Sequence, residues 1–328
     1  MTPREPRSDA GAADTRARVF GGRRKRGGSG EELMVPRAEF RSYYGRPVLK
    51  PPVWEWKVPA YLFTGGLAAG TSLLAAGADL TGRPALRRVG RAGSLGALVA
   101  SVYLLVADLG RPARFHHMLR VAKPTSPMSV GTWILSAFGP GMGVAAAAEV
   151  VPWRLVAAVA RPAGLVSAVF APAVASYTAV LLSQTAVPAW HEAHAELPFV
   201  FTGSAAASSG GFAMALVPVE EAGPARVLAA IGAATELVAS KVLEKRLGLT
   251  AEAYTTGKAH RLRKWSERLT AAGLLGALAG HRSRAVSVAA GAALFAGSAL
   301  QRFGVFEAGV ASTKDPKYVV VPQRQRRP

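Results

Sequence analysis

Long apolar blocks separated by short charged segments dominate the chain after Trp56. Windows rich in apolar residues cover 58–80, 89–110, 129–151, 163–187, 197–219, 223–241, 266–282 and 284–304. Most of them have the length of about 20 residues that a helix needs to cross a hydrocarbon core of about 30 Å. The last two are shorter, and the charged turn His281-Arg282-Ser283-Arg284 between them predicts a helical hairpin. The pattern therefore predicts an all-α integral membrane protein with about eight transmembrane helices.

The segments outside these windows divide the chain into three parts. Residues 1–52 are rich in Arg, Gly and Pro and lack a helical or strand period, so we expect a basic, mostly disordered N-terminal tail. Residues 53–306 form the predicted polytopic transmembrane domain, and residues 307–328 form a C-terminal tail. Because the basic tail is attached to a membrane bundle, we expect it to face lipid or solvent rather than nucleic acid.

Small residues are frequent inside the windows, as in Gly65-Gly66-Leu67-Ala68-Ala69-Gly70 and Ser208-Ser209-Gly210-Gly211. Helices associate in lipid through close contact between small residues, because lipid removes the hydrophobic driving force between them. A tightly packed helical bundle is expected.

The chain carries a net charge of +20 and has no cysteine. Without cysteine there is no thiolate ligand for an iron–sulfur cluster, so metal redox chemistry must belong to other subunits. The histidines lie in predicted loops or at helix ends, at positions 116, 117, 191, 194, 260 and 281. A haem held between helices needs buried histidines on facing segments. We therefore expect no metal and no haem in this chain.

An even number of helices places both termini on one side of the membrane, together with the loops that follow the second, fourth and sixth windows. We call this side the terminal face. Its cations include Arg41, Arg46, Lys50, Lys57, Arg111, Arg114, Arg120, Lys123 and the run from Lys241 to Arg268. The opposite face has Arg83, Arg87, Arg88 and Arg91 in one loop. Because cytoplasmic loops carry an excess of Lys and Arg, this pattern predicts a multi-pass plasma-membrane protein with cytoplasmic termini.

Polar side chains gather where the first four windows meet the terminal face. They are Lys57, Tyr61, Asp108, Arg111, Ser129, Trp133 and Gln184. Hydrogen-bonding groups just below a membrane surface, surrounded by apolar walls, suit an amphipathic ring such as a quinone head group. Quinone reduction also consumes protons, and Tyr177 and Glu236, which lie deeper in their windows, are candidates for a proton relay.

Simpler interpretations of these residues stay open. Asp108 and Arg111 have the i, i+3 spacing of a local ion pair, and Lys57 has the position of a snorkelling interfacial anchor. Trp54, Trp56, Trp133, Trp153 and Trp190 fit the aromatic belt of a membrane surface. A secondary transporter would instead bind its substrate near the bilayer midplane. A passive anchor for peripheral enzymes would need no polar pocket.

Several motifs together resemble the NrfD/polysulfide reductase membrane-subunit family, and the likeness runs from about Tyr43 to the C-terminus. The motifs are Tyr43-Tyr44-Gly45-Arg46-Pro47, Pro52-Val53-Trp54-Glu55-Trp56, the string from Tyr61 to Gly70, Asp108-Leu109-Gly110-Arg111-Pro112, Ser126-Pro127-Met128-Ser129-Val130-Gly131-Thr132-Trp133 and Asp315-Pro316-Lys317-Tyr318. Each alone is weak, and their combination is specific.

The resemblance implies two four-helix bundles without a redox metal, and a site for menaquinone or ubiquinone near the face that docks a ferredoxin-like 4Fe-4S subunit. That subunit would connect to a molybdopterin catalytic subunit, so this chain alone would not be catalytic. Carried over to this sequence, Lys57, Tyr61 and the Asp108–Arg111 motif line the quinone pocket, and Tyr177 matches a tyrosine of the fourth helix. Some members have Asn or His at the start of the first helix, where this chain has Lys57.

The resemblance and the charge pattern disagree about orientation. Polysulfide reductase members dock their partners outside the cytoplasm, whereas the positive charge here places the docking face inside. Basic loops under a partner subunit also attract an acidic iron–sulfur protein, which is a second reason for the same charges. We keep the cytoplasmic placement as the expectation.

Overall fold

The computed structural model describes residues 47–151, 153–279 and 283–325, and every regular element in these ranges is a helix. Residues 1–46 lie outside the described part, and with them most of the predicted N-terminal tail and the motif Tyr43-Tyr44-Gly45-Arg46. The middle of the predicted turn at His281-Arg282 lies outside it as well.

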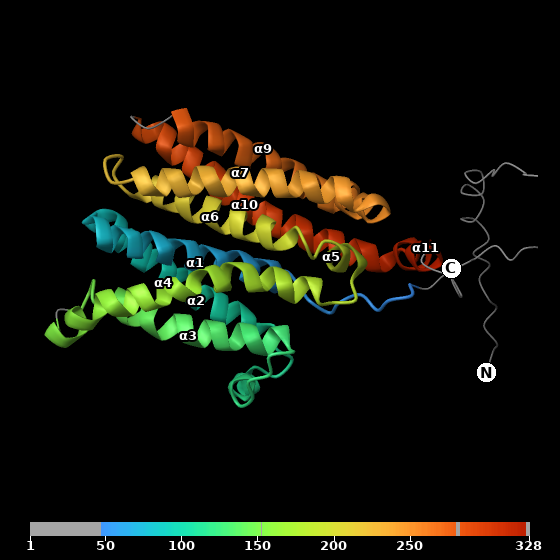
Figure 1. Cartoon of the computed structure of the whole chain (residues 1–328), viewed down its shortest axis with the longest axis horizontal. Helices are drawn as coiled ribbons and strands as arrows, with labels where there is room; N and C mark the ends of the chain where they lie inside the picture. Colours follow the sequence, from blue (N-terminus) through green and yellow to red (C-terminus); the bar gives the residue numbers. More distant parts are fainter. Residues whose placement is uncertain (1–46, 152, 280–282, 326–328) are drawn as a thin grey trace, which may run out of the picture. The chain divides into compact units, whose positions relative to one another are not determined.

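Eight long helices follow one another with alternating direction (Figure 1). They are α1 (Lys57–Thr81), α2 (Pro84–Ala107), α3 (Pro127–Ala147), α4 (Arg154–Ser183), α6 (Leu197–Leu216), α7 (Gly223–Arg246), α9 (Gly257–Ala279) and α10 (Arg284–Lys314). The short elements are η2 (Pro112–Leu119), α5 (Pro188–Glu192), η3 (Gly248–Ala251), α8 (Glu252–Thr255) and α11 (Lys317–Gln325). All short elements lie at the end where α1 begins and α10 finishes, which corresponds to the terminal face.

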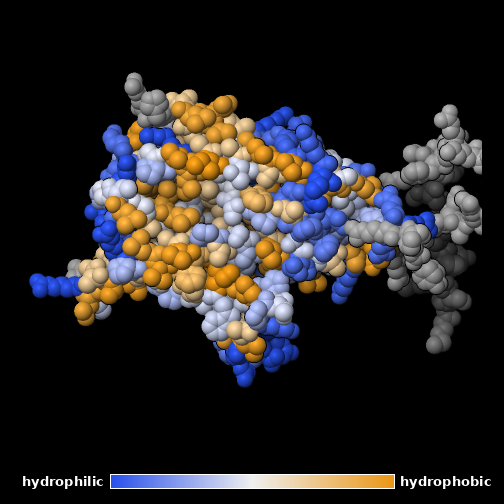
Figure 2. All heavy atoms as spheres, viewed as in Figure 1, coloured by the Kyte–Doolittle hydropathy of each residue, from blue (hydrophilic) through white to orange (hydrophobic). Residues whose placement is uncertain are grey.

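Six of the long helices are apolar enough and long enough to cross a membrane, namely α1, α2, α3, α4, α6 and α10. Large apolar side chains such as Val99, Val169 and Leu275 are exposed on the outside of the helices. Figure 2 shows that exposed apolar side chains cover the middle of this view, while hydrophilic side chains gather toward the two ends. The prediction of an all-α integral membrane protein is thereby confirmed.

The long helices pack as antiparallel neighbours, α1 with α2, α3 with α4, α6 with α7, and α9 with α10. Helix α1 also packs against α4 and α6, and α10 packs against α6 (Figure 1). Small residues permit these approaches: a Cβ added to Gly211 of α6 would lie 2.7 Å from the carbonyl oxygen of Gly291 of α10. Such contacts fit the expectation that small residues hold the helices together in lipid.

Several helices extend beyond the apolar windows that predicted them. Helix α2 begins at Pro84, so three of the arginines expected in a loop lie in its first turns. Helix α9 begins at Gly257 rather than near residue 266, and α10 continues to Lys314, past the expected end of the membrane domain at residue 306. Hydropathy marks where a helix is apolar, whereas backbone hydrogen bonding continues through charged residues outside the bilayer.

The arginines at the start of α2 form an ion cluster at the opposite face. Arg91 is 4% exposed, and its guanidinium donates to Asp79 at 2.5 Å and to Glu149 at 2.9 Å. Arg87 donates to Glu149 at 2.9 Å. The cluster therefore joins the end of α1 and the segment after α3 to α2, and it compensates the charges that α2 carries near the membrane.

Candidate functional site

The start of α1 and the end of α2 bring Lys57 and Asp108 together at the terminal face. Lys57 is paired with Glu55 at 3.1 Å, and Asp108 caps α2 just outside the apolar span. Burial raises the pKa of Asp108 above its usual value, while the nearby Lys57 charge lowers it and the Glu55 carboxylate raises it. Lys57 and Asp108 thus form a charged mouth at the end of the helix pair.

Tyr61 lies one turn deeper than Lys57 and is 3% exposed. Its hydroxyl makes no hydrogen bond to any residue that the structure describes. Tyr177 of α4 belongs to the same apolar cluster, and its ring occupies the space left by Gly131 of α3. A buried hydroxyl normally finds a partner, because an unmet hydrogen bond costs about 1–3 kcal/mol. Tyr61 is therefore a donor available to a ligand.

Ser129 and Trp133 lie at the start of α3 and hold the preceding loop. The Ser129 hydroxyl donates to the carbonyl of Val121 at 3.0 Å and accepts the backbone N–H of Lys123 at 2.9 Å. The Trp133 indole donates to the same Val121 carbonyl at 3.4 Å. These side chains also line an apolar hollow of about 340 Å³ that reaches Phe170. Their hydrogen bonds are thus used within the protein.

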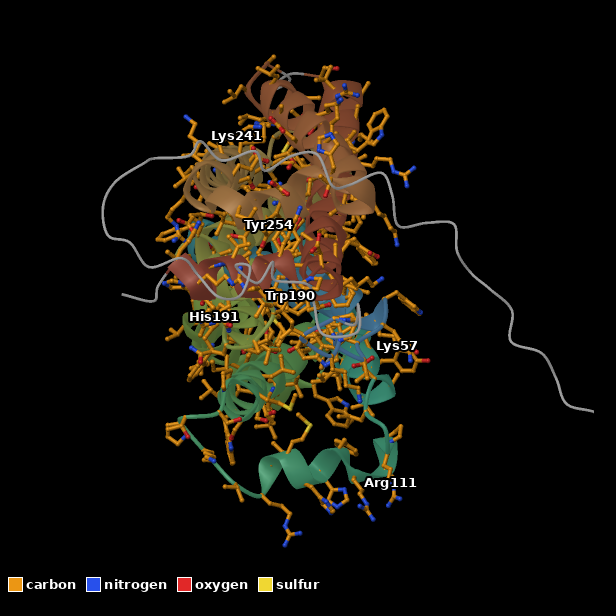
Figure 3. All side chains as sticks on the ribbon, turned by 90° about the vertical axis from the view of Figure 1, so that its right-hand side faces the viewer. Lys57, Arg111, Trp190, His191, Lys241 and Tyr254 are labelled. Atoms are coloured by element: carbon orange, nitrogen blue, oxygen red, sulfur yellow. The ribbon has the colours of Figure 1, made fainter. Side chains whose placement is uncertain are left out.

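Arg111 and Gln184 are both exposed at helix ends on the terminal face, and neither is paired with Lys57 or Asp108 in the described structure. Arg111 precedes η2 and is exposed, and no ion pair joins it to Asp108 although both residues are described. Figure 3 shows Arg111 at the edge of the terminal face, away from Lys57. Gln184 is the exposed C-cap of α4. The local ion pair that the i, i+3 spacing suggested is therefore absent from the described structure.

An apolar cavity of about 240 Å³ lies between α2, η2 and α3. Leu105 and Val106, which directly precede the Asp108 corner, line it together with Phe115 and Met118 of η2. It has the character of a site for an apolar group whose polar end would lie at a helix terminus.

Trp190 does not belong to the aromatic belt in which its sequence position placed it. It is fully buried, stacks on Trp54 with ring centroids 5.8 Å apart, and donates its indole N–H to the Val305 carbonyl at 2.8 Å. Tyr254 of α8 donates to the carbonyl of Ala189 at 2.8 Å, and burial raises the pKa of its hydroxyl. Figure 3, which views the molecule from the terminal face, labels both residues near the middle of that end. The cluster fixes α5 and the segment before α1 against α10.

Glu236 lies in a separate polar cluster between α7, α9 and α10. It is 2% exposed and accepts hydrogen bonds from Thr270 at 3.3 Å and Ser298 at 3.4 Å. Arg302 of α10 is 1% exposed, interacts electrostatically with Glu236, and donates to the Phe201 carbonyl at 2.6 Å. Tyr177 has no contact with this cluster among the described interactions.

Sequence reasoning missed Arg302 and Gln301, although both lie inside the window 284–304. An arginine followed by apolar residues near the end of a window is easily taken as a helix end. The continuation of the apolar pattern to Val305 and Phe306 was the signal that Arg302 is buried.

Within the described residues, no group of three or more His, Asp or Glu side chains is placed to hold a metal ion. The histidines of the terminal face are exposed, as for His191 and His194, whose rings lie 6.4 Å apart.

The search of curated proteins found no match to this chain. The family profile described as polysulphide reductase, NrfD, matches residues 48–223, which is more than half of the chain. The match covers α1 to α6 and therefore includes Lys57, Tyr61, Asp108 and Tyr177. The chain belongs to the NrfD polysulphide reductase family of membrane subunits.

Proposed function

We propose that this chain exchanges electrons between a ferredoxin-like 4Fe-4S subunit and the membrane quinone pool, as the membrane subunit of a molybdopterin-type respiratory oxidoreductase. Membership of the NrfD family supports a place in a reductase complex. The chain by itself holds no cysteine for a cluster. The electrons must therefore arrive from, or leave to, a partner.

The observation that supports the quinone assignment is Tyr61, which is 3% exposed, lies one turn below Lys57, and makes no side-chain hydrogen bond to another described residue. A quinone carbonyl is an acceptor that would use this donor, and the apolar cavity between α2, η2 and α3 suits an isoprenoid chain. When bound, a quinone supplies two-electron, two-proton redox chemistry. The residues present fit such a ring.

In this proposal the side chains hold and move protons around the ring. Tyr61 donates a hydrogen bond to a carbonyl oxygen, and Asp108 exchanges protons with the terminal face. Lys57 offsets the Glu55 and Asp108 carboxylates at the mouth, and its ammonium group would stabilise a developing negative charge on the ring. Ser129 and Trp133 hold the loop that precedes α3, and Arg111 and Gln184 would supply exposed polar groups for the ring to meet on its way in from the terminal face. Tyr177 and Glu236 are the proposed inner relay.

The terminal face is the proposed docking surface for the iron–sulfur subunit. Many of its cations are exposed, including Arg111, Arg114, Arg120 and Lys123. A positive surface steers an acidic partner and fixes its orientation. On the charge pattern we further propose that this face is cytoplasmic.

We also propose that α7 and α9 cross the membrane with the six apolar helices, so that eight helices form two four-helix bundles. Both helices are long enough to cross a bilayer. Helix α7 packs on α6, and α9 packs on α10. Their charges lie mainly in the turns nearest the terminal face.

A secondary transporter is the second candidate, because Glu236 and Arg302 lie deep within the helices, where such proteins bind substrate. The polar mouth at Lys57 and Asp108 favours the quinone assignment, since a midplane transporter does not need it. A passive anchor needs neither feature.

The test is purification of the tagged protein in a gentle detergent, followed by assay for iron, molybdenum and extractable quinone. Co-purified iron–sulfur and molybdopterin subunits, with quinone that is lost in Asp108→Ala, would support the proposal. Tyr103→Phe on α2 is the control, because the Tyr103 side chain is 70% exposed and does not line the cavity between α2, η2 and α3. A lone protein free of iron and quinone would favour the transporter.

A further inference from the structure

The cluster around Glu236 contains more polar groups than its hydrogen bonds use. Arg302 is 1% exposed, yet its Nε and Nη1 atoms are buried without a partner in the described structure. The Nε atom of Arg263 on α9 is in the same condition. Buried guanidinium groups keep their charge and need acceptors. Water molecules in contact with these nitrogens would satisfy them.

A narrow cavity, here called the passage, extends from Glu236 toward the exposed pair Lys241 and Glu267 on the terminal side. Its lining residues are Glu236, Leu237, Ser240, Lys241, Arg263, Ser266, Glu267 and Gln301, and its volume of about 10 Å³ is roughly that of one water molecule. The outer end of the passage lies at Lys241, which pairs with Glu267 at 2.8 Å. The inner wall is held by the hydrogen bond from Gln301 to Ser240 at 3.0 Å. Glu236 lies about 15 Å from the end of α7 at Arg246.

The passage is closed toward the opposite face. Beyond Glu236 the facing residues are small or apolar, in a cluster that includes Ala229, Ala233, Ala277 and Leu294. The helices there are in close contact: a Cβ on Gly273 of α9 would lie 3.0 Å from the Ala290 carbonyl oxygen of α10, and one on Gly232 of α7 would lie 2.7 Å from the Gly203 carbonyl oxygen of α6. Such packing leaves no room for a chain of water molecules.

We propose that Glu236 is a proton-binding site that water reaches from the terminal face only, with an apolar seal between it and the opposite face. The carboxylate takes one proton from water in the passage and returns it by the same route. The charged groups around it are Arg302 of α10, Arg263 and Glu267 of α9, and Lys241 and Glu244 of α7, of which Glu244 is paired with Arg263 at 2.9 Å, while α6 presents Ser204. The inference deepens the proposed relay by naming its side of supply, and it depends on α7, α9 and α10 crossing the membrane.

The first test is infrared difference spectroscopy of the full-length protein between two pH values. The C=O band of a protonated carboxyl is expected to appear at the lower pH, to shift in D₂O, and to be absent in Glu236→Gln. A spectrum without such a band would overturn the proposal, because Glu236 would then be a permanently ionised partner of Arg302.

The second test measures access and does not require Glu236 to be changed. The chain has no cysteine, so single cysteines can be introduced without a background. In sealed vesicles, Ag⁺ added on the terminal side should block the labelling of Ser240→Cys by a maleimide that is added after the protein has been unfolded in SDS, and Ag⁺ on the opposite side should not. Ala229→Cys in the seal should be unreactive from both sides. Arg261→Cys and Glu220→Cys, which are exposed on the two faces, report orientation.

Reaction of Ser240→Cys from the opposite side, or of Ala229→Cys from either side, would contradict a seal. Neither experiment uses quinone or a partner subunit. A protein that passes both tests but binds no quinone would therefore keep this proposal and lose the one on function, and the reverse result would do the opposite.

Discussion

The first four long helices and the later four long helices differ in where their polar side chains lie. In α1 to α4, charged and hydrogen-bonding side chains lie at the two ends, at Lys57 and Asp108 on one face and at Arg91 with Asp79 on the other. In α6, α7, α9 and α10, a carboxylate and an arginine lie deep inside. A charge in a membrane interior is costly and usually functional. The first region suits a ligand entering at the surface, and the second suits a proton held in the interior.

The largest effect expected from this difference is at Arg302. Replacing it by Met leaves the Glu236 carboxylate without a buried compensating charge, so we expect a loss of about 3–5 kcal/mol in the free energy of unfolding. Equilibrium unfolding in detergent measures it. The double variant with Glu236→Gln should recover most of the loss, since no uncompensated charge then remains. Equal losses in the single and double variants would mean that Arg302 acts by packing alone.

A smaller loss is expected where the later helices are in backbone contact. Gly211→Val places side-chain atoms against Gly291 of α10, and overpacking of this kind costs about 1–3 kcal/mol. Gly96→Val on α2 is the control, because nothing lies within 4 Å of a Cβ at that position. Thermal unfolding of both variants compares them. Equal stability would show that α6 and α10 can move apart freely.

Variants in the first four helices should change the rate of turnover rather than the stability of the protein. Tyr61→Phe removes one hydrogen bond to the proposed ligand, worth about 1.4 kcal/mol, so quinone-dependent electron transfer in the complex should fall about tenfold. Tyr103→Phe should leave the rate unchanged. Stopped-flow measurement with a soluble quinone analogue provides the readout. An unchanged rate in Tyr61→Phe would remove the residue from the site.

The smallest effect concerns the charged mouth. Lys57 lowers the pKa of Asp108, so Lys57→Gln should raise that pKa further above its usual value. Because the folded pKa of Asp108 is already raised, its proton stabilises the folded state at acid pH, and this stabilisation is lost as pH rises through the folded pKa. The further increase in the Asp108 pKa should also move the acid limb of the pH–rate profile to higher pH. Lys258→Gln, on the same face but paired with Glu307 at 2.6 Å, is the control and should leave the limb in place.

The sequence predicted the first region better than the second. Apolar windows located all eight long helices, and the polar ends of α1 and α2 stood out because they interrupt those windows. The meeting of Lys57 with Asp108 follows from the short α1–α2 hairpin. The cluster around Glu236 could not be predicted in the same way. It joins residues from α7, α9 and α10, and only tertiary packing brings Thr270 and Ser298 to one carboxylate.

The burial of Trp190 was hidden for a related reason. A tryptophan near a helix end fits a membrane interface equally well, and its site is created by Gly309, which is distant in sequence. Similarly, Arg263 looked like part of a charged loop, because the helix α9 starts before its apolar stretch does.

The position of Arg302 also bears on how the protein is made. The groups that receive its side chain, the Phe201 carbonyl, the space beside Gly66 and the Glu236 carboxylate, all belong to helices that leave the ribosome before α10. The last long helix can thus bring its arginine to a receptor that earlier segments have assembled. A charged residue that would be costly to insert alone then meets its partners as it enters the bilayer.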